Sequence, residues 1–102
     1  MAILTAVTIQ PHSAEVWDDL QKRLKKIKEL VEKAGGENAT VLVTMVGGQA
    51  TNQLVFLTST DNWTSYGKIQ DAFYGNPQAQ AEIAEAAKLA TWQTFAAQTL
   101  DL

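Results

Sequence analysis

Residues 39–60, ATVLVTMVGGQATNQLVFLTST, contain two apolar, β-branched runs separated by a polar segment with two glycines. Runs of this kind, bounded by turn-forming residues, predict the two strands of a β-hairpin, near Ala39–Val46 and Gln53–Thr60. The connecting residues 47–52, GGQATN, have the composition of a hairpin loop. Because a strand and not a helix N-terminus follows this loop, its glycines do not predict a phosphate-binding cradle.

A strand and a long helix are predicted upstream of the hairpin. Ile3–Gln10 is rich in β-branched residues and ends at Pro11. Ser13 is suited to be the N-cap of a helix that stops at Gly35 and Gly36. Within that helix, apolar residues recur at intervals of three and four, as in an amphipathic helix: Trp17, Leu20, Leu24, Ile27, Val31 and Ala34.

A broken helix and a final strand are predicted downstream of the hairpin. Thr60 or Asp61 can cap a helix that ends at Gly75, and Asn76-Pro77 then start a second helical segment that runs to about residue 89. Residues 92–100 form the last strand. The order β-α-β-β-α-β predicts one α+β domain over residues 1–102 with the ferredoxin-like fold, in which a four-stranded antiparallel sheet carries its helices on one face.

The predicted strands are apolar on both faces, although helices cover only one. A sheet covered on one side normally alternates apolar and polar residues. Within the first strand Ile3, Val7 and Ile9 oppose Leu4 and Ala6, within the second Val41, Val43 and Met45 oppose Leu42 and Val46, and within the third Leu54 and Phe56 oppose Val55 and Leu57. The sequence does not determine which of these sets faces away from the helices. An exposed apolar face of that size is unusual on a monomer, and a second copy of the same sheet is the simplest cover. We therefore expect a homodimer whose sheets pack face to face.

Both the order of elements and a short helical pattern resemble the dimeric α/β-barrel superfamily. The pattern consists of Trp63, Tyr66-Gly67, Phe73, Asn76-Pro77 and Gln80. Aspartate often precedes the proline in that superfamily, whereas this chain has asparagine. Its members include antibiotic-biosynthesis-type monooxygenases, stress-responsive barrel proteins and NIPSNAP-like proteins. Members that degrade haem use a histidine on the second helix as the iron ligand, and this chain has none there, so the resemblance does not imply haem chemistry.

Composition and charge exclude several classes of partner. The net charge is −3 and cysteine is absent, which argues against nucleic acid as a partner and against a disulfide framework. Lysine and arginine between residues 22 and 28 have acidic residues four positions away, as on a solvated helix face. Glu82 and Glu85 are interpreted as surface charge. With one histidine, no membrane-spanning stretch and no signal peptide, we expect a cytoplasmic protein with no metal, no cofactor and no membrane partner.

A candidate ligand-binding site lies on the helix that begins near residue 62. On a helical wheel, Trp63, Tyr66, Gln70 and Phe73 share one arc, and Gly67 lies on the opposite shoulder. Large aromatic walls with one polar amide are typical of a small-molecule pocket, and the glycine leaves room for a ligand or a closely packed helix. An aromatic core stripe with a bonded amide explains the same residues equally well.

His12, the only histidine, is a candidate general base or hydrogen-bond donor at the end of the first strand. A solvated loop residue is the alternative for it. The residues thus leave three functions open: a homodimeric protein that binds a small hydrophobic or aromatic molecule in an apolar pocket, a structural or regulatory dimer with a filled core, and an enzyme. The resemblance implies that the enzyme would be a cofactor-independent monooxygenase or cyclase acting on an aromatic, polyketide-like substrate.

Overall fold

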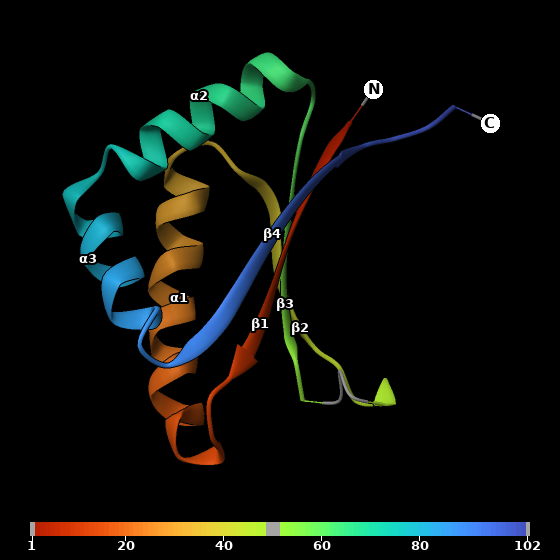
Figure 1. Ribbon diagram of the computed structural model, residues 1–102. Coiled ribbons are helices and arrows are strands. Elements are labelled where there is room, and N and C mark those ends of the chain that lie inside the picture. The colour runs from red at the N-terminus through yellow and green to blue at the C-terminus, as the bar shows by residue number, and fades with distance from the viewer. Residues whose placement is uncertain (1, 49–51, 102) are drawn as a thin grey trace.

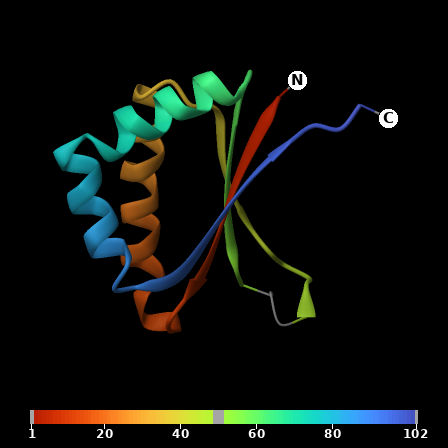
Figure 2. The ribbon, with the colours of Figure 1, turned by 45° about the horizontal axis from the view of Figure 1, so that its top comes forward.

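A single antiparallel sheet in the order β2-β3-β1-β4 forms one layer of the molecule, and the helices form the other (Figure 1). The computed structural model describes residues 2–48 and 52–101. Its elements are β1 (Ile3–Pro11), a 3₁₀ turn (Ala14–Val16), α1 (Trp17–Lys33), β2 (Glu37–Val43), β3 (Leu54–Thr60), α2 (Trp63–Tyr74), α3 (Pro77–Ala86) and β4 (Ala90–Gln98). All helices lie on the same side of the sheet (Figures 1 and 2). This confirms the ferredoxin-like α+β fold.

The hairpin that suggested the fold is present, with its first strand shifted toward the N-terminus. β2 and β3 pair antiparallel, and two hydrogen bonds close the hairpin beyond them, from Thr44 N to Gln53 O and from Asn52 N to Thr44 O, both 2.8 Å. Of the predicted loop, residues 49–51 lie outside the described part of the chain. The shift of β2 arises because pairing with β3 already begins at Glu37, opposite Ser59.

Helix caps follow the sequence in one place and depart from it in two. Asn76 caps α3 as expected, since its side chain accepts a hydrogen bond from Gln78 N and Pro77 occupies the first turn. Asn62, not Thr60 or Asp61, caps α2 by accepting from Ser65 N at 2.8 Å. Ser13 makes no side-chain capping bond, because a 3₁₀ turn separates it from α1. The prediction of a Ser13 cap was therefore wrong.

The core lies between α1 and the helix-facing side of the sheet. Ile9 of β1 is fully buried there, opposite Leu54 of β3, and Phe56 of β3 belongs to the same cluster. The α1 stripe packs onto this surface with five buried side chains: Leu20, Leu24, Ile27, Leu30 and Val31. Each such side chain contributes about 1.5–3 kcal/mol when fully removed from water. None of the helices in the described part of the chain combines the length and apolar content needed to cross a membrane.

Helices α1 and α3 are joined by a buried carboxylate. Glu82 is only 7% exposed and accepts a 3.0 Å hydrogen bond from Arg23 Nη1, with Lys26 Nζ 3.7 Å away. The hydrogen bond and charge of Glu82 raise the pKa of Arg23 above its ordinary value. The interpretation of Glu82 as surface charge was therefore wrong. A helical spacing of charges does not reveal that a neighbouring helix will cover one of them.

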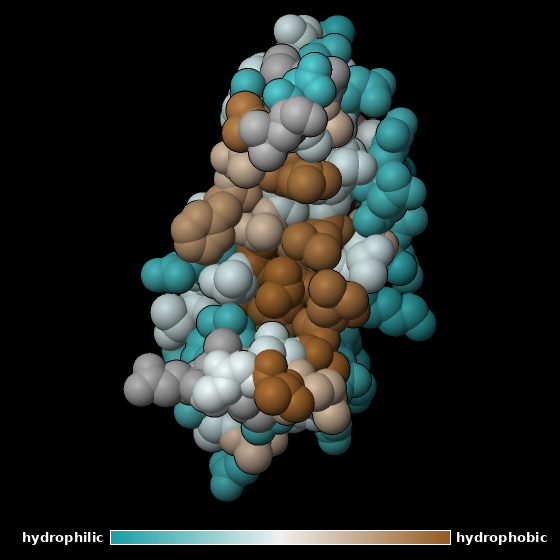
Figure 3. All heavy atoms as spheres, turned by 90° about the vertical axis from the view of Figure 1, so that its right-hand side faces the viewer, coloured by the Kyte–Doolittle hydropathy of each residue, from teal (hydrophilic) through white to brown (hydrophobic). Residues whose placement is uncertain are grey.

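The sheet face opposite the helices is apolar and uncovered. Leu4, Leu42 and Phe95 are each about half exposed on it, at 50%, 47% and 55%, and hydrophobic side chains gather in its centre (Figure 3). Strand register places these residues on one side. Phe95 pairs with Ala6, which lies two residues from Leu4 on β1, and Leu42 pairs with Val55, which pairs in turn with Thr8 of β1. The sequence argument for two apolar sheet faces thus holds in the described residues.

Candidate functional site

A cavity of about 260 Å³ lies between the helices and the sheet. Its walls are mainly apolar and come from every layer of the fold; they include Leu24, Ile27, Phe56, Phe73, Ile83 and Trp92. The space arises because small side chains meet there: α3 contributes Ala86, and the sheet contributes Thr5, Thr58 and Thr94. Val7 is consequently only partly buried, although it lies on the helix-facing side of β1, which is flanked by β3 and β4.

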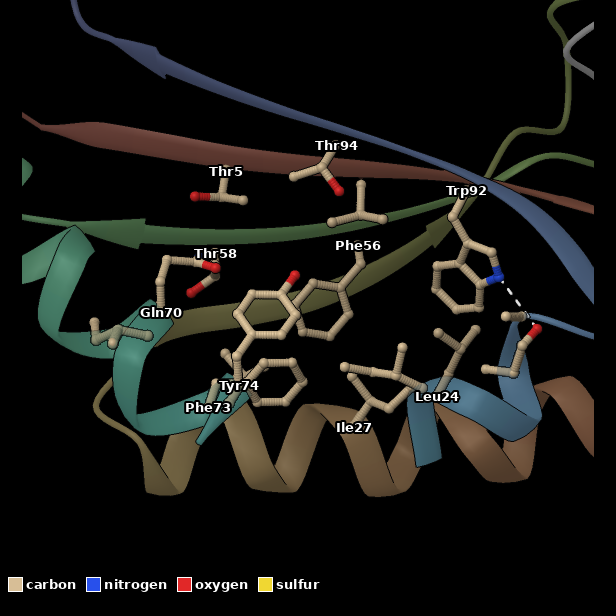
Figure 4. A pocket seen from close by; sticks show the side chains of 16 residues that line it. Thr5, Leu24, Ile27, Phe56, Thr58, Gln70, Phe73, Tyr74, Trp92 and Thr94 are labelled. Atoms are coloured by element: carbon tan, nitrogen blue, oxygen red, sulfur yellow. Dashed lines mark hydrogen bonds between the residues drawn. The ribbon is translucent and has the colours of Figure 1, made fainter. Parts of the chain in front are cut away.

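One end of the cavity carries the hydrogen-bonding groups. Thr5 and Thr58 are direct cross-strand partners on β1 and β3, and both are buried, at 5% and 8% exposure. Their hydroxyl groups and the Gln70 amide of α2 lie together at this end (Figure 4). Thr58 Oγ1 donates to the Glu37 carbonyl at 2.8 Å. Neither the Thr5 hydroxyl nor the Gln70 amide makes a hydrogen bond to any residue that the structure describes. We call Thr5, Thr58 and Gln70 the polar end.

The opposite end is closed by the Trp92 indole (Figure 4). Its Nε1 donates to the Ala86 carbonyl at 3.1 Å, which satisfies the only polar atom of the ring and fixes its plane. Tyr74 lies between the two ends, with its ring against Phe73 at a centroid distance of 5.2 Å and its hydroxyl toward the sheet. Tyr74 is 51% exposed and is the only titratable side chain among the described residues that line the cavity.

Only part of the aromatic helix predicted from sequence faces the cavity. Gln70 and Phe73 line it, whereas Trp63, Tyr66 and Gly67 do not. The Trp63 indole is 44% exposed, donates to Gln98 Oε1 at 2.9 Å and contacts Tyr66 edge to face. A Cβ added at Gly67 would meet no heavy atom within 4 Å. In the described chain, therefore, no neighbouring helix packs closely on Gly67, and Gly67 does not line the cavity.

His12 lies outside the cavity, in the turn after β1. Its ring is exposed, with Nδ1 3.2 Å from the Lys88 carbonyl and Nε2 3.3 Å from Thr91 Oγ1. The His12 backbone N–H also donates to Leu89 O at 2.9 Å. These contacts tie the turn to the start of β4, and they give the imidazole no access to the cavity.

Sequence reasoning missed the sheet side of the site. The threonines were visible as polar residues on an otherwise apolar alternating face, since Thr5 falls between Ile3 and Val7 and Thr58 follows Phe56 by two. Threonine is common in strands, so this signal was weak. Trp92 and Tyr74 had no signal, because their positions depend on how the helices cross the sheet.

Solved structures similar to this one share its fold at low sequence identity. Neither a protein-family model nor a curated protein sequence matches the chain. SnoaB, a cofactor-independent oxygenase from Streptomyces nogalater, superposes with a TM-score of 0.76 at 10% identity, over 99% of this chain and 95% of its own. A NIPSNAP family protein from Agrobacterium tumefaciens gives 0.77 at 13% identity, over 99% and 95%. An uncharacterized NIPSNAP domain protein from Burkholderia xenovorans gives 0.74 at 12% identity, over 95% and 94%. The resemblance expected from the sequence is thus confirmed as a likeness of fold: the chain has the ferredoxin-like fold that these oxygenase and NIPSNAP structures share.

Proposed function

We propose that this protein binds a small, mainly apolar molecule in the cavity between its helices and its sheet. The observation that carries the proposal is the cavity itself, about 260 Å³ with walls dominated by aliphatic and aromatic side chains. A cavity of about 150 Å³ holds benzene, so this one suits a molecule of about two fused rings. Protein cores are close-packed and leave few voids larger than a water molecule. Its size therefore favours a binding site over the filled core that the sequence left open.

The residues that line the cavity fit a protein that binds its ligand better than an enzyme that uses general acid–base catalysis. General acid–base catalysis needs a titratable group within hydrogen-bond reach of the substrate. Among the described lining residues only Tyr74 has one, and His12 lies elsewhere. A cofactor-independent oxygenase remains the second candidate, supported by the fold shared with SnoaB and by the aromatic walls Phe56, Phe73 and Trp92. In that case an electron-rich ring of the substrate would itself supply the electrons for its reaction with oxygen.

We also propose that the protein acts as a homodimer through its uncovered sheet face. Leu4, Leu42 and Phe95 are half exposed there. Apolar side chains in such number on one face are typical of an interaction surface. A twofold axis would bring the same patch of two copies together and bury it in both.

Native mass spectrometry of the purified protein, combined with calorimetric titration of naphthalene, tests the binding proposal. Val7→Phe places a ring in the cavity from the sheet side, and we expect it to abolish binding. Ala72→Phe adds the same ring to an exposed position of α2 outside the cavity lining and should leave binding unchanged. Equal affinity of the wild type and Val7→Phe would show that the cavity is not the site. Oxygen uptake with a bound hydroxyaromatic compound would favour the oxygenase.

A further inference from the structure

We propose that the ligand is uncharged and carries a hydroxyl group, which binds at the polar end of the cavity. This inference rests on the proposed function and specifies the chemical class of the ligand. It is carried by Thr5, a residue that is only 5% exposed and lines the cavity, and whose hydroxyl makes no hydrogen bond to any residue of the described chain. A hydroxyl that is shielded from bulk water and faces a cavity without a protein partner is destabilising unless a ligand or water in that cavity satisfies it.

The charge of the ligand follows from the residues around the cavity. Lysine, arginine, histidine, aspartate and glutamate are all absent from the described residues that line it. An ionised group moved into such a space loses its hydration and gains no counter-charge. Carboxylates, phosphates and ammonium groups are therefore excluded at the polar end, whereas neutral hydrogen-bonding groups are accepted.

The hydrogen-bonding capacity of the polar end distinguishes a hydroxyl group from a carbonyl or an ether. A threonine hydroxyl has a single proton, and Thr58 already donates its proton to the Glu37 carbonyl at 2.8 Å. Toward the cavity, Thr58 Oγ1 can therefore only accept. The Gln70 amide can donate through Nε2, and the Thr5 hydroxyl can donate or accept. A ligand hydroxyl can donate to one of these groups and accept from another, whereas a carbonyl or an ether oxygen can only accept.

The apolar remainder of the ligand would extend from the polar end toward Trp92. Phe56 and Ile27 line the intervening space from the sheet and from α1 (Figure 4). The Trp92 indole has its only donor bonded to Ala86, so it presents apolar surface to the cavity. An aromatic ring system with one hydroxyl at its edge matches this distribution, and a phenol is the simplest such group.

Four two-ring compounds at pH 7 test this inference by calorimetry: naphthalene, 2-naphthol, 2-methoxynaphthalene and 2-naphthoate. We expect 2-naphthol to bind about tenfold more tightly than naphthalene, the value of one net hydrogen bond. The methyl ether can accept from Gln70 or Thr5 but cannot donate to Thr58 Oγ1, so it should bind more weakly than 2-naphthol, and the carboxylate should bind most weakly. Methyl ether binding equal to that of 2-naphthol, or carboxylate binding tighter than that of naphthalene, would overturn the inference.

Two threonine variants supply the matched control. Thr5→Val removes the unpartnered hydroxyl in the cavity with little change of shape, and we expect it to remove most of the preference for 2-naphthol while leaving naphthalene binding intact. Thr60→Val removes an unpartnered hydroxyl that is buried on the same sheet face but outside the cavity lining, so it should leave the preference unchanged. If wild type binds naphthalene and 2-naphthol equally, the inference fails and the proposed function stands. If it binds neither, both fail.

Discussion

Replacement of Leu42 by glutamate should dissociate the proposed homodimer. Leu42 lies on the uncovered face and is 47% exposed in one chain, and Leu4 and Phe95 are exposed to a similar degree. Burial of the exposed half of such a side chain contributes about 1 kcal/mol. Across two copies, these three residues contribute about 6 kcal/mol. That is comparable with the lower part of the cost of association, about 4–15 kcal/mol, so the remaining apolar residues of the face must supply the surplus.

The substitution acts twice in a symmetric dimer. Each copy loses the burial of one leucine and gains a carboxylate that would be enclosed without a partner, which costs about 3–5 kcal/mol when the burial is complete. Even partial enclosure, at about 1.5 kcal/mol per copy, raises the dissociation constant more than about 100-fold. The variant should therefore be monomeric at concentrations where the wild type is dimeric.

Val43→Glu is the matched control, since Val43 is the next residue of β2 and is 40% exposed on the helix-facing side. This control introduces glutamate, a residue disfavoured in strands, into the same strand as Leu42→Glu. It leaves the proposed interface intact. Sedimentation velocity over a dilution series should give twice the chain mass of 11.1 kDa for the wild type and for Val43→Glu. It should give the single-chain mass for Leu42→Glu. A monomeric wild type, or the same mass for both variants, would refute the face-to-face arrangement.

Four further predictions concern stability and can be measured together by urea unfolding. Thr60→Val should raise the free energy of unfolding by about 1 kcal/mol, because Thr60 Oγ1 is buried without a partner in the described chain. Gly67→Ala should raise it by about 0.4–1 kcal/mol, since the added methyl meets open space. Gly36→Ala should lower it by about 1–3 kcal/mol, because its Cβ would lie 2.6 Å from Val31 Cγ1. Gln70→Leu should change it by less than about 0.5 kcal/mol, as an unpartnered amide is lost; a larger loss would indicate that this amide is bonded as in a filled core.

The sequence predicted the order of elements because each boundary has a local cause. Asn76-Pro77 starts a helix because the asparagine side chain caps it and proline fits its first turn. The alternation of Ile3, Val7 and Ile9 determines which of their neighbours point away from the helices. The apolar second face of the sheet was visible for the same reason. Periodicity within one segment is sufficient for conclusions of this kind.

The site was predicted less well because it depends on how elements are placed against each other. A helical wheel assigns Trp63 and Tyr66 to the same arc as Gln70, but it carries no information about position along the sheet. In the folded chain Trp63 reaches the end of β4, where it bonds to Gln98, and only the later part of α2 covers the cavity. Trp92 and Thr5, far from α2 in sequence, supply the rest of the site.

Intermolecular nuclear Overhauser effects between bound 2-naphthol and the methyl groups of the protein test the central claim most directly. We predict contacts to Val7, Leu24 and Ile27, which line the cavity, with the proton beside the naphthol hydroxyl nearest the methyl group of Thr5. Contacts only to Leu4 and Leu42, on the opposite face of the sheet, would contradict the placement of the ligand between helices and sheet.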